Sequence, residues 1–281
     1  MPEEPLVVAL GERRYRVERR WCRPSEQEPL GFVSDLVVDS GGFVHVGQRG
    51  TESPVLVFDP TGAFVRSWGK GAIADVHYLS IDADDQILLA DRDAHQILAF
   101  GTDGRLRFAL GERHAPRWQA PFNHPTAASM APDGEVYVSD GYGNSAVHRF
   151  SADGALRQTW GGRGAGSGEF TTPHCVWVDR MERVLVCDRE NDRLQVFDRA
   201  GTQIAEWGDF YHPMKIYVDD RDFIFVTDQI PRISMLDPAG ELAGRCRGAI
   251  NGAHGLWGDR AGNLYLAELP PEQVTRLTLL A

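Results

Sequence analysis

The stretch VWVDRMERVLVCD (residues 176–188) is one of six copies of a single unit in this sequence. Each copy has an apolar run, a polar turn and a second apolar run that ends in a polar or acidic residue. The other five copies are, in chain order, LVVDSGGFVHVGQ (36–48), SIDADDQILLAD (80–91), SMAPDGEVYVSD (129–140), IYVDDRDFIFVTD (216–228) and LWGDRAGNLYLAE (256–268). Such a repeat decides the fold, because every copy must form the same supersecondary structure.

The spacing of the copies indicates what that structure is. The second runs end at residues 48, 91, 140, 188, 228 and 268, so successive copies lie 40 to 49 residues apart. A third strand follows and leads into a turn with glycine, as in PVLVFDPTG (54–62), and a fourth often closes on an aromatic residue and glycine, as in AFVRSWG (63–69). Four short antiparallel strands at this spacing are typical of a propeller blade. We therefore predict an all-β fold, a six-bladed β-propeller.

The two ends of the sequence complement each other. The sixth unit stops after its third strand, VTRLTLL (274–280), whereas YRVERRW (15–21) resembles a fourth strand that lacks a unit. Pairing the two would close the ring and remove exposed strand edges. We predict that residues 1–281 form a single propeller domain, with 1–14 as an N-terminal extension and 15–21 as the strand that closes the last blade. Two β-sandwiches, the rival interpretation, would explain neither the repeat nor the orphan strand.

The composition narrows the class of protein. Hydrophobic residues make up 42% and charged residues 25% of the chain, as in a soluble globular protein. The sequence contains no run of 18 apolar residues and no recognisable signal peptide, so we expect a cytoplasmic protein without a membrane partner. A net charge of −11 argues against nucleic acid as a partner. The four cysteines lack a CxxC pair and are expected to be buried, reduced thiols: Cys22, Cys175, Cys187 and Cys246.

Three histidines share one position of the repeat. Histidine stands fourteen residues before the strand end in the second, fourth and sixth units, at His77, His174 and His254. The first strand of a blade lines the central channel, so alternate blades would place these imidazoles roughly 120° apart around the axis. Three imidazoles with an open position are the ligand set of catalytic zinc sites. We predict a metal site here; the alternative is a hydrated channel lined with polar residues.

Further histidines and a methionine fall near the same mouth. His124 and His212 each precede a proline, sixteen residues before a strand end, and Met214 shares the index of the three histidines in the fifth unit. We consider these three residues candidate substrate-binding groups. For the two histidines, packing within loops is an equally good interpretation.

The residues that follow the strand ends enter loops at this mouth. Arg49 and Arg189 could bind a substrate carboxylate through bidentate hydrogen bonds. Tyr142 could act as a general base, if a metal lowers its pKa, or could donate a hydrogen bond to an oxyanion. Arg92 is flanked by Asp91 and Asp93 and is expected to form ion pairs instead.

At this point the sequence resembles a known family. The repeats resemble NHL repeats, and VSDGYGNS (138–145) and VCDRENDRLQVF (186–197) are similar to segments of the peptidyl-α-hydroxyglycine α-amidating lyases, which are zinc enzymes. The resemblance extends from about QRG (48–50) to the end of the chain. It implies three zinc-binding histidines, an active-site tyrosine and two active-site arginines: His77, His174 and His254, Tyr142, and Arg49 and Arg189.

The sequence departs from this family beside the last histidine. Gly252 stands where the family has a methionine, and Gly255 where it has an aspartate that contributes to a calcium site. A structural calcium ion (Ca²⁺) is therefore not expected here. The family's disulfides, its attached copper hydroxylase domain and a secretion signal are not evident either, which argues against a secreted peptide as the substrate.

Together these features predict a lyase dependent on zinc (Zn²⁺) or another divalent metal. It would cleave a carbinolamide-like or other α-hydroxy small molecule, with the arginines holding a carboxylate. Two other classes stay open: a hydrolase or lactonase on the same three histidines, and a non-enzymatic NHL scaffold that binds another protein. The products separate the first two, because a hydrolase adds water and a lyase does not. The sequence does not indicate the oligomeric state.

Overall fold

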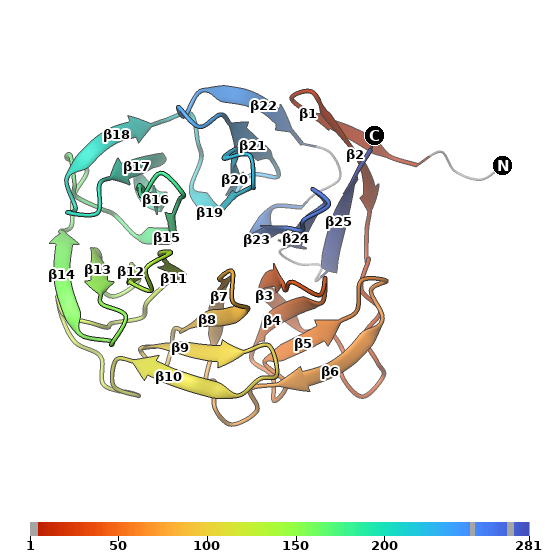
Figure 1. Ribbon diagram of the computed structural model, residues 1–281, viewed down its shortest axis with the longest axis horizontal. Coiled ribbons are helices and arrows are strands. Elements are labelled where there is room, and N and C mark those ends of the chain that lie inside the picture. The colour runs from red at the N-terminus through yellow and green to blue at the C-terminus, as the bar shows by residue number, and fades with distance from the viewer. Residues whose placement is uncertain (1–4, 248–250, 269–272, 281) are drawn as a thin grey trace.

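The chain folds into six antiparallel sheets around a common axis, as the computed structural model shows (Figure 1). The structure describes residues 5–247, 251–268 and 273–280. Within these ranges every regular element is a strand except one short 3₁₀-helix, η1 (Arg189–Asn191). The predicted all-β, six-bladed propeller is confirmed.

The strands form four concentric layers, which we number by blade. The innermost strands of blades 1 to 6 are β3 (Phe32–Val38), β7 (Val76–Ile81), β11 (Ala127–Met130), β15 (Pro173–Val178), β19 (Pro213–Val218) and β23 (Ala253–Gly258). The second strands are β4 (Val44–Arg49), β8 (Gln86–Asp91), β12 (Val136–Asp140), β16 (Val184–Asp188), β20 (Ile224–Asp228) and β24 (Leu264–Glu268). The third are β5 (Val55–Phe58), β9 (Gln96–Gly101), β13 (Ala146–Phe150), β17 (Arg193–Phe197), β21 (Ile233–Leu236) and β25 (Gln273–Leu279). The fourth strands are β6 (Phe64–Trp68), β10 (Leu106–Leu110), β14 (Leu156–Gly161), β18 (Gln203–Trp207), β22 (Leu242–Cys246) and, in blade 6, β2 (Arg13–Glu18).

An aspartate builds the turn between the first and second strands of most blades. In blade 1 one oxygen of Asp39 accepts hydrogen bonds from the main-chain N–H groups of Gly41 (3.0 Å) and Phe43 (2.9 Å). Gly42 between them has φ +80°, which glycine adopts without strain. The same pair of bonds recurs at Asp82, Asp179, Asp219 and Asp259. This turn explains why the polar segment of the repeat carries Asp.

Aromatic residues of one blade pack on the next. Trp68, at the end of the outer strand of blade 1, lies 4.8 Å, between ring centroids, from Phe100 on the third strand of blade 2. A Cβ added to Gly104 would lie 2.6 Å from Trp68, so the turn after that third strand needs glycine for space as well as for its positive φ. Trp160 and Phe197 repeat the contact between blades 3 and 4 at 5.9 Å. The Phe, Gly and Trp residues that recur in the repeat therefore form packing contacts between neighbouring blades.

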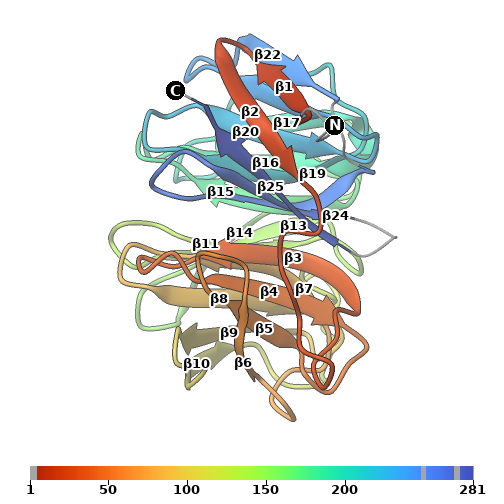
Figure 2. The same cartoon turned by 90° about the vertical axis from the view of Figure 1, so that its right-hand side faces the viewer.

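The N-terminal strand closes the ring, as predicted. β2 pairs with β25 in blade 6, where Val17 lies opposite Leu277. The closing strand covers Arg13–Glu18 rather than residues 15–21, because the chain turns at Arg20, whose φ is +50°. Part of the predicted extension is also a strand: β1 (Val7–Leu10) turns at Gly11 and adds a fifth strand to blade 6 (Figure 2).

The cysteines are free thiols in the described part of the chain. Cys22, Cys175 and Cys187 are buried, as expected, whereas Cys246, on the outer strand β22, is only half-buried. None of the described helices is long and apolar enough to span a membrane.

Candidate metal centre

His77, His174 and His254 converge at one end of the propeller axis. Each stands at the second position of an innermost strand, β7, β15 or β23. The pairing between the first and second strands shifts register at each of them, which marks a β-bulge. A bulge re-aims a side chain, and here it accompanies three imidazoles turned toward each other. Their ring centroids lie 5.0, 5.1 and 5.4 Å apart, with planes 83° to 85° from one another.

Main-chain carbonyl groups orient all three imidazoles. The Nδ1 atom of His77 lies 2.6 Å from the carbonyl oxygen of Thr126. That of His174 lies 3.0 Å from the oxygen of Met214, and that of His254 lies 2.7 Å from the oxygen of Ser34. A carbonyl oxygen can only accept, so each Nδ1 carries the proton and a neutral ring presents the lone pair of Nε2. This arrangement also orients metal-ligating histidines in proteins.

Burial keeps the three rings neutral. It is the main cause that lowers the pKa of His77, His174 and His254, to about 3 for His254. The mutual repulsion of their positive forms lowers the pKa of His77 and His174 further. The three ligand nitrogen atoms lie within 4.8 Å of one another. Three buried, neutral, oriented imidazoles could hold a metal ion, and this donor set fits zinc.

The hydroxyl of Tyr142 lies against this cluster. Its oxygen is 3.0 Å from Nε2 of His77 and 3.0 Å from Nε2 of His174. Two close approaches explain the glycines beside it: a Cβ on Gly141 would lie 2.1 Å from the carbonyl oxygen of Pro173, and one on Gly143 would lie 2.3 Å from the side chain of Asn123. The two glycines thus let the loop at 140–143 pack closely against its neighbours, and this packing positions Tyr142 against the histidines.

Positive charge surrounds the Tyr142 hydroxyl. Burial raises the pKa of this hydroxyl above its ordinary value, while the guanidinium groups of Arg189, Arg49 and Arg92 act in the opposite direction. Arg92 has its guanidinium carbon 5.8 Å from the centre of the Tyr142 ring. These groups would stabilise a phenolate at this position.

Asp75 holds two of the arginines. It forms a two-pronged contact with Arg49, in which Nε and Nη2 lie 3.0 Å from its two carboxylate oxygens. Nη2 of Arg92 lies 3.3 Å from the same carboxylate. Arg92 also forms the expected ion pair with Asp93, at 2.8 Å. The sequence did not single out Asp75, which precedes a strand and belongs to no repeated motif.

Arg189 begins η1, directly after β16. Its side chain is 18% exposed, and its Nε lies 3.5 Å from Glu190. This Nε has no hydrogen-bond partner among the described residues. A buried guanidinium N–H without a partner is available to a ligand. The positive charges of Arg49 and Arg189 help to lower the pKa of His254, so both side chains lie near the histidines that Tyr142 contacts.

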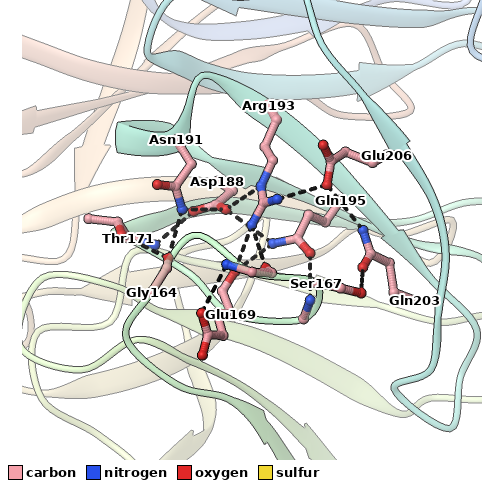
Figure 3. A network of polar contacts seen from close by, with 12 residues as sticks. Gly164, Ser167, Glu169, Thr171, Asp188, Asn191, Arg193, Gln195, Gln203 and Glu206 are labelled. Atoms are coloured by element: carbon pink, nitrogen blue, oxygen red, sulfur yellow. Dashed lines mark hydrogen bonds and ion pairs between the residues drawn. The ribbon is translucent and has the colours of Figure 1, made fainter.

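A polar network fixes the segment that carries Arg189 (Figure 3). The carboxylate of Asp188 accepts hydrogen bonds from the main-chain N–H of Thr171 and from the side chains of Asn191, Arg193 and Gln195, at 2.8 to 3.1 Å. Arg193 also donates to main-chain oxygens of the glycine-rich loop 162–170, at Gly166 and Glu169. The network ties this loop to η1, so that Arg189 extends from a rigid base.

The predicted substrate-binding residues have other partners in the structure or act through the main chain. His124 packs its ring 4.3 Å from that of His95, and its main-chain N–H donates to His95. His212 lies beside η1, with Nδ1 3.2 Å from Glu190. Met214 offers its carbonyl oxygen to His174, so its contribution is to orient a histidine. The first two stay candidates for the wall of a substrate site.

Tyr78 is a site residue that sequence reasoning missed. It follows His77 and is fully buried beneath the cluster. Its hydroxyl lies 2.8 Å from the carbonyl oxygens of Met214 and His254 and 3.2 Å from Nδ1 of His174. It therefore supports the main chain that carries two of the histidines. The available signal was its place in the sequence, directly after the repeat position that His77 occupies.

A buried ion pair lies next to Tyr78. Nζ of Lys215 is 2.6 Å from the carboxylate of Asp35, 2.7 Å from the carbonyl oxygen of Leu79 and 4.4 Å from the centre of the Tyr78 ring. A Cβ on Gly255 would lie 2.2 Å from Asp35, so this glycine leaves room for the carboxylate. Asp35 of blade 1 thus fills the space next to the last histidine, and Lys215 already neutralises it.

Comparison with known proteins agrees with this description. A family model, the NHL repeat, matches residues 170–197. NHL repeat-containing protein 3 of Mus musculus is 28% identical, over 93% of this chain and 83% of its own length. A probable peptidyl-alpha-hydroxyglycine alpha-amidating lyase of Caenorhabditis elegans is 28% identical, over 95% of this chain and 78% of its own. Peptidyl-alpha-hydroxyglycine alpha-amidating lyase 1 of Drosophila melanogaster is 31% identical, over 52% of this chain and 29% of its own.

Solved structures share the fold at low identity. A gluconolactonase from Xanthomonas campestris superposes with a TM-score of 0.72 at 15% identity and covers 99% of this chain and 95% of its own. A streptogramin B lyase superposes with a TM-score of 0.69 at 13% identity and covers 97% and 100%. At this identity the two establish the architecture alone. The chain is thus a six-bladed propeller that contains an NHL repeat and is similar in sequence to peptidyl-α-hydroxyglycine α-amidating lyases.

Proposed function

We propose that this protein is a zinc-dependent lyase that breaks the C–N bond of a small α-hydroxy amide bearing a carboxylate. The observation that carries the proposal is the position of the Tyr142 hydroxyl, 3.0 Å from two of the three metal-competent histidines. A proton-transfer group and a metal site at one point suit the removal of a proton from a substrate hydroxyl. The names of the sequence relatives support the same reaction class.

Each residue has a role in this proposal. Zinc held by His77, His174 and His254 would act as a Lewis acid that lowers the pKa of the substrate hydroxyl. Tyr142 would accept the hydroxyl proton once bound zinc lowers its pKa, and the nearby guanidinium groups act in the same direction against the effect of burial. Arg189, whose Nε has no partner among the described residues, binds the substrate carboxylate.

The reaction needs no further reactant. As the hydroxyl oxygen loses its proton it forms a C=O double bond, the C–N bond breaks, and the nitrogen takes up a proton. An N-acyl-α-hydroxyglycine would thus give a primary amide and glyoxylate. We propose a small molecule of this kind as the ligand, rather than nucleic acid or a membrane, in keeping with the net charge of −11.

The products test the proposal. The protein is stripped of metal with a chelator, reloaded with zinc and incubated with N-benzoyl-α-hydroxyglycine. We expect benzamide and glyoxylate from the reloaded protein only, above the rate without protein. Benzoate as the product would instead indicate a hydrolase that attacks the acyl carbon. Absence of turnover by fully reloaded, folded protein, with this compound and with its alkyl and peptidyl analogues, would contradict a lyase and favour a scaffold.

A further inference from the structure

A cavity opens at the end of the axis opposite to the histidines. It has a volume of about 490 Å³. Its wall includes the last residues of four innermost strands, Val38, Ile81, Val218 and Gly258, whereas the histidines stand near the beginning of such strands. The cavity wall contains none of the three histidines, Tyr142, Arg49 or Arg189. It is therefore a site separate from the candidate metal centre.

One side of this cavity is aromatic. Trp177, Tyr217 and Trp257 occupy the same position of the repeat in blades 4, 5 and 6, and all three line the cavity. Their ring centroids lie 5.2 to 5.8 Å apart. Blades 1 to 3 have smaller residues at this position: Val37, Ser80 and Ser129. At this repeat position, blades 4 to 6 therefore present aromatic rings, whereas blades 1 to 3 present small side chains that leave more space.

The polar groups of the three aromatic residues form no hydrogen bond with the described residues. The Tyr217 side chain is nearly enclosed, since the residue is 9% exposed, and its ring lies over Gly258, where a Cβ would be 2.5 Å from the hydroxyl oxygen. In the described part of the chain, this hydroxyl and the indole N–H groups of Trp177 and Trp257 are not among the fully buried polar atoms that lack a partner. They are therefore accessible from the cavity that the three rings line.

The charge at this opening is negative. Six aspartates and three arginines line the cavity: Asp39, Asp82, Asp85, Asp219, Asp220 and Asp259, and Arg13, Arg221 and Arg260. Burial raises the pKa of the Tyr217 hydroxyl, and the carboxylates of Asp219, Asp220 and Asp259 raise it further. The negative charges around this hydroxyl would attract a positively charged ligand.

We propose that this cavity binds a small organic cation. Aromatic faces attract ammonium groups through their quadrupoles, and tryptophan does so most strongly. The carboxylates around the opening add attraction over a longer range. The hydroxyl of Tyr217 binds a polar group of the same ligand. This inference does not depend on the lyase activity.

Choline is a suitable probe, because it combines a quaternary ammonium with a hydroxyl group. 3,3-Dimethylbutan-1-ol is its neutral counterpart of almost the same shape. We expect choline to produce a saturable change in tryptophan fluorescence and a matching heat by calorimetry, and we expect added salt to weaken it. The neutral alcohol should bind at least several-fold more weakly. Equal affinity for the two compounds, or no saturable binding of choline, would overturn the proposal.

Two pairs of variants locate the binding. Trp177→Phe should weaken choline binding several-fold, whereas Trp160→Phe, at another half-buried tryptophan outside the cavity, should leave it unchanged. Asp220→Asn should also weaken it, whereas Glu26→Gln removes an exposed negative charge elsewhere and should have no effect. All four variants should remain folded, by circular dichroism, and keep the wild-type metal content. If each test variant binds choline like its control, the cation binds elsewhere and the assignment is wrong.

Discussion

The imidazole of His77 donates its Nδ1 proton to the carbonyl oxygen of Thr126, the residue at the same repeat position in the next blade. His174 and Met214 are related in the same way, as are His254 and Ser34. The odd-numbered blades therefore orient the ligands of the even-numbered blades. Because the acceptors are main-chain atoms, the centre tolerates changes in the side chains that carry them.

This relationship predicts which substitutions remove the metal. His174→Ala takes away one of three ligands and should reduce the zinc bound after dialysis from one per chain to a small fraction. Met214→Leu keeps the carbonyl group and should retain zinc. Elemental analysis of both purified variants checks the prediction. Equal zinc in His174→Ala and the wild type would show that the metal binds elsewhere.

Loss of the Tyr142 hydroxyl should slow the chemical step. In Tyr142→Phe we expect kcat to fall roughly 10²-fold or more, because the proton acceptor is gone, with little change in KM. Zinc content should stay at the wild-type level. Tyr211→Phe, at a tyrosine that is 47% exposed, is the control and should keep full activity. An active Tyr142→Phe would exclude this residue as the base.

Arg189 should contribute according to the charge of the substrate. Arg189→Met should raise KM for N-benzoyl-α-hydroxyglycine roughly 10- to 100-fold, because a charge-assisted hydrogen bond to the carboxylate is lost. The loss should be much smaller for the corresponding carboxamide. Arg180→Met removes an arginine exposed on the far rim and serves as the control. A similar loss for both substrates would indicate that Arg189 does not bind the carboxylate.

Removing one partner of the Asp35–Lys215 pair should destabilise the fold strongly, whereas replacing both partners should destabilise it much less. Lys215→Met leaves the Asp35 carboxylate buried without a partner, and we expect the free energy of unfolding to fall by about 3–5 kcal/mol. The double variant Asp35→Asn/Lys215→Met buries no unpaired charge and should recover a large part of that loss. Urea unfolding of the two variants measures the difference. A double variant as unstable as Lys215→Met would mean that lysine packing, rather than charge, dominates.

Glu135 should make stability depend on acid pH. Hydrogen bonds from Arg149 and Arg199 lower its pKa to about 2, whereas its ordinary value is 4.5. Its ion pairs therefore stabilise the fold above about pH 4.5, and this contribution disappears as the pH falls toward 2. Glu135→Gln should lose roughly 1–2 kcal/mol at pH 7, and the gap to the wild type should narrow as the pH falls. Glu112 forms an exposed pair with Arg117 and is the control. Glu112→Gln should change the free energy of unfolding by only a few tenths of a kcal/mol, both at pH 7 and at acid pH.

The repeat register accounts for most of the fold that could be predicted. Turn aspartates and strand ends recur at fixed intervals, so the predicted strand ends at 91, 140, 188, 228 and 268 coincide with the ends of the second strands and the one at 48 falls one residue short. The same index brought His77, His174 and His254 together, because equivalent positions of a propeller lie at equal depth on one axis.

Contacts between unlike positions could not be predicted in this way. Asp35 and Lys215 come from blades 1 and 5, 180 residues apart, and neither belongs to a repeated motif. Asp75 holds Arg49 and Arg92 through a loop that the repeat does not specify. β1 is four residues long and lacks a copy elsewhere, so only the hairpin turn at Gly11 defines it. These contacts depend on how the blades pack against one another in space, and the spacing of the repeats along the sequence gives no information about that packing.

The closure of blade 6 has a consequence for biosynthesis. β2, which is synthesised before blades 1 to 5, pairs with β25. The hairpin at Gly11 packs so tightly on β22 that a Cβ on Gly244 would lie 2.1 Å from the Gly11 nitrogen. Blades 1 to 5 can form in order as they are synthesised, since each pairs only with its own residues. The N-terminal hairpin, however, must wait for its partners through the synthesis of five blades. During that interval it is an unpaired edge, and a chaperone that shields it would protect the nascent chain from aggregation.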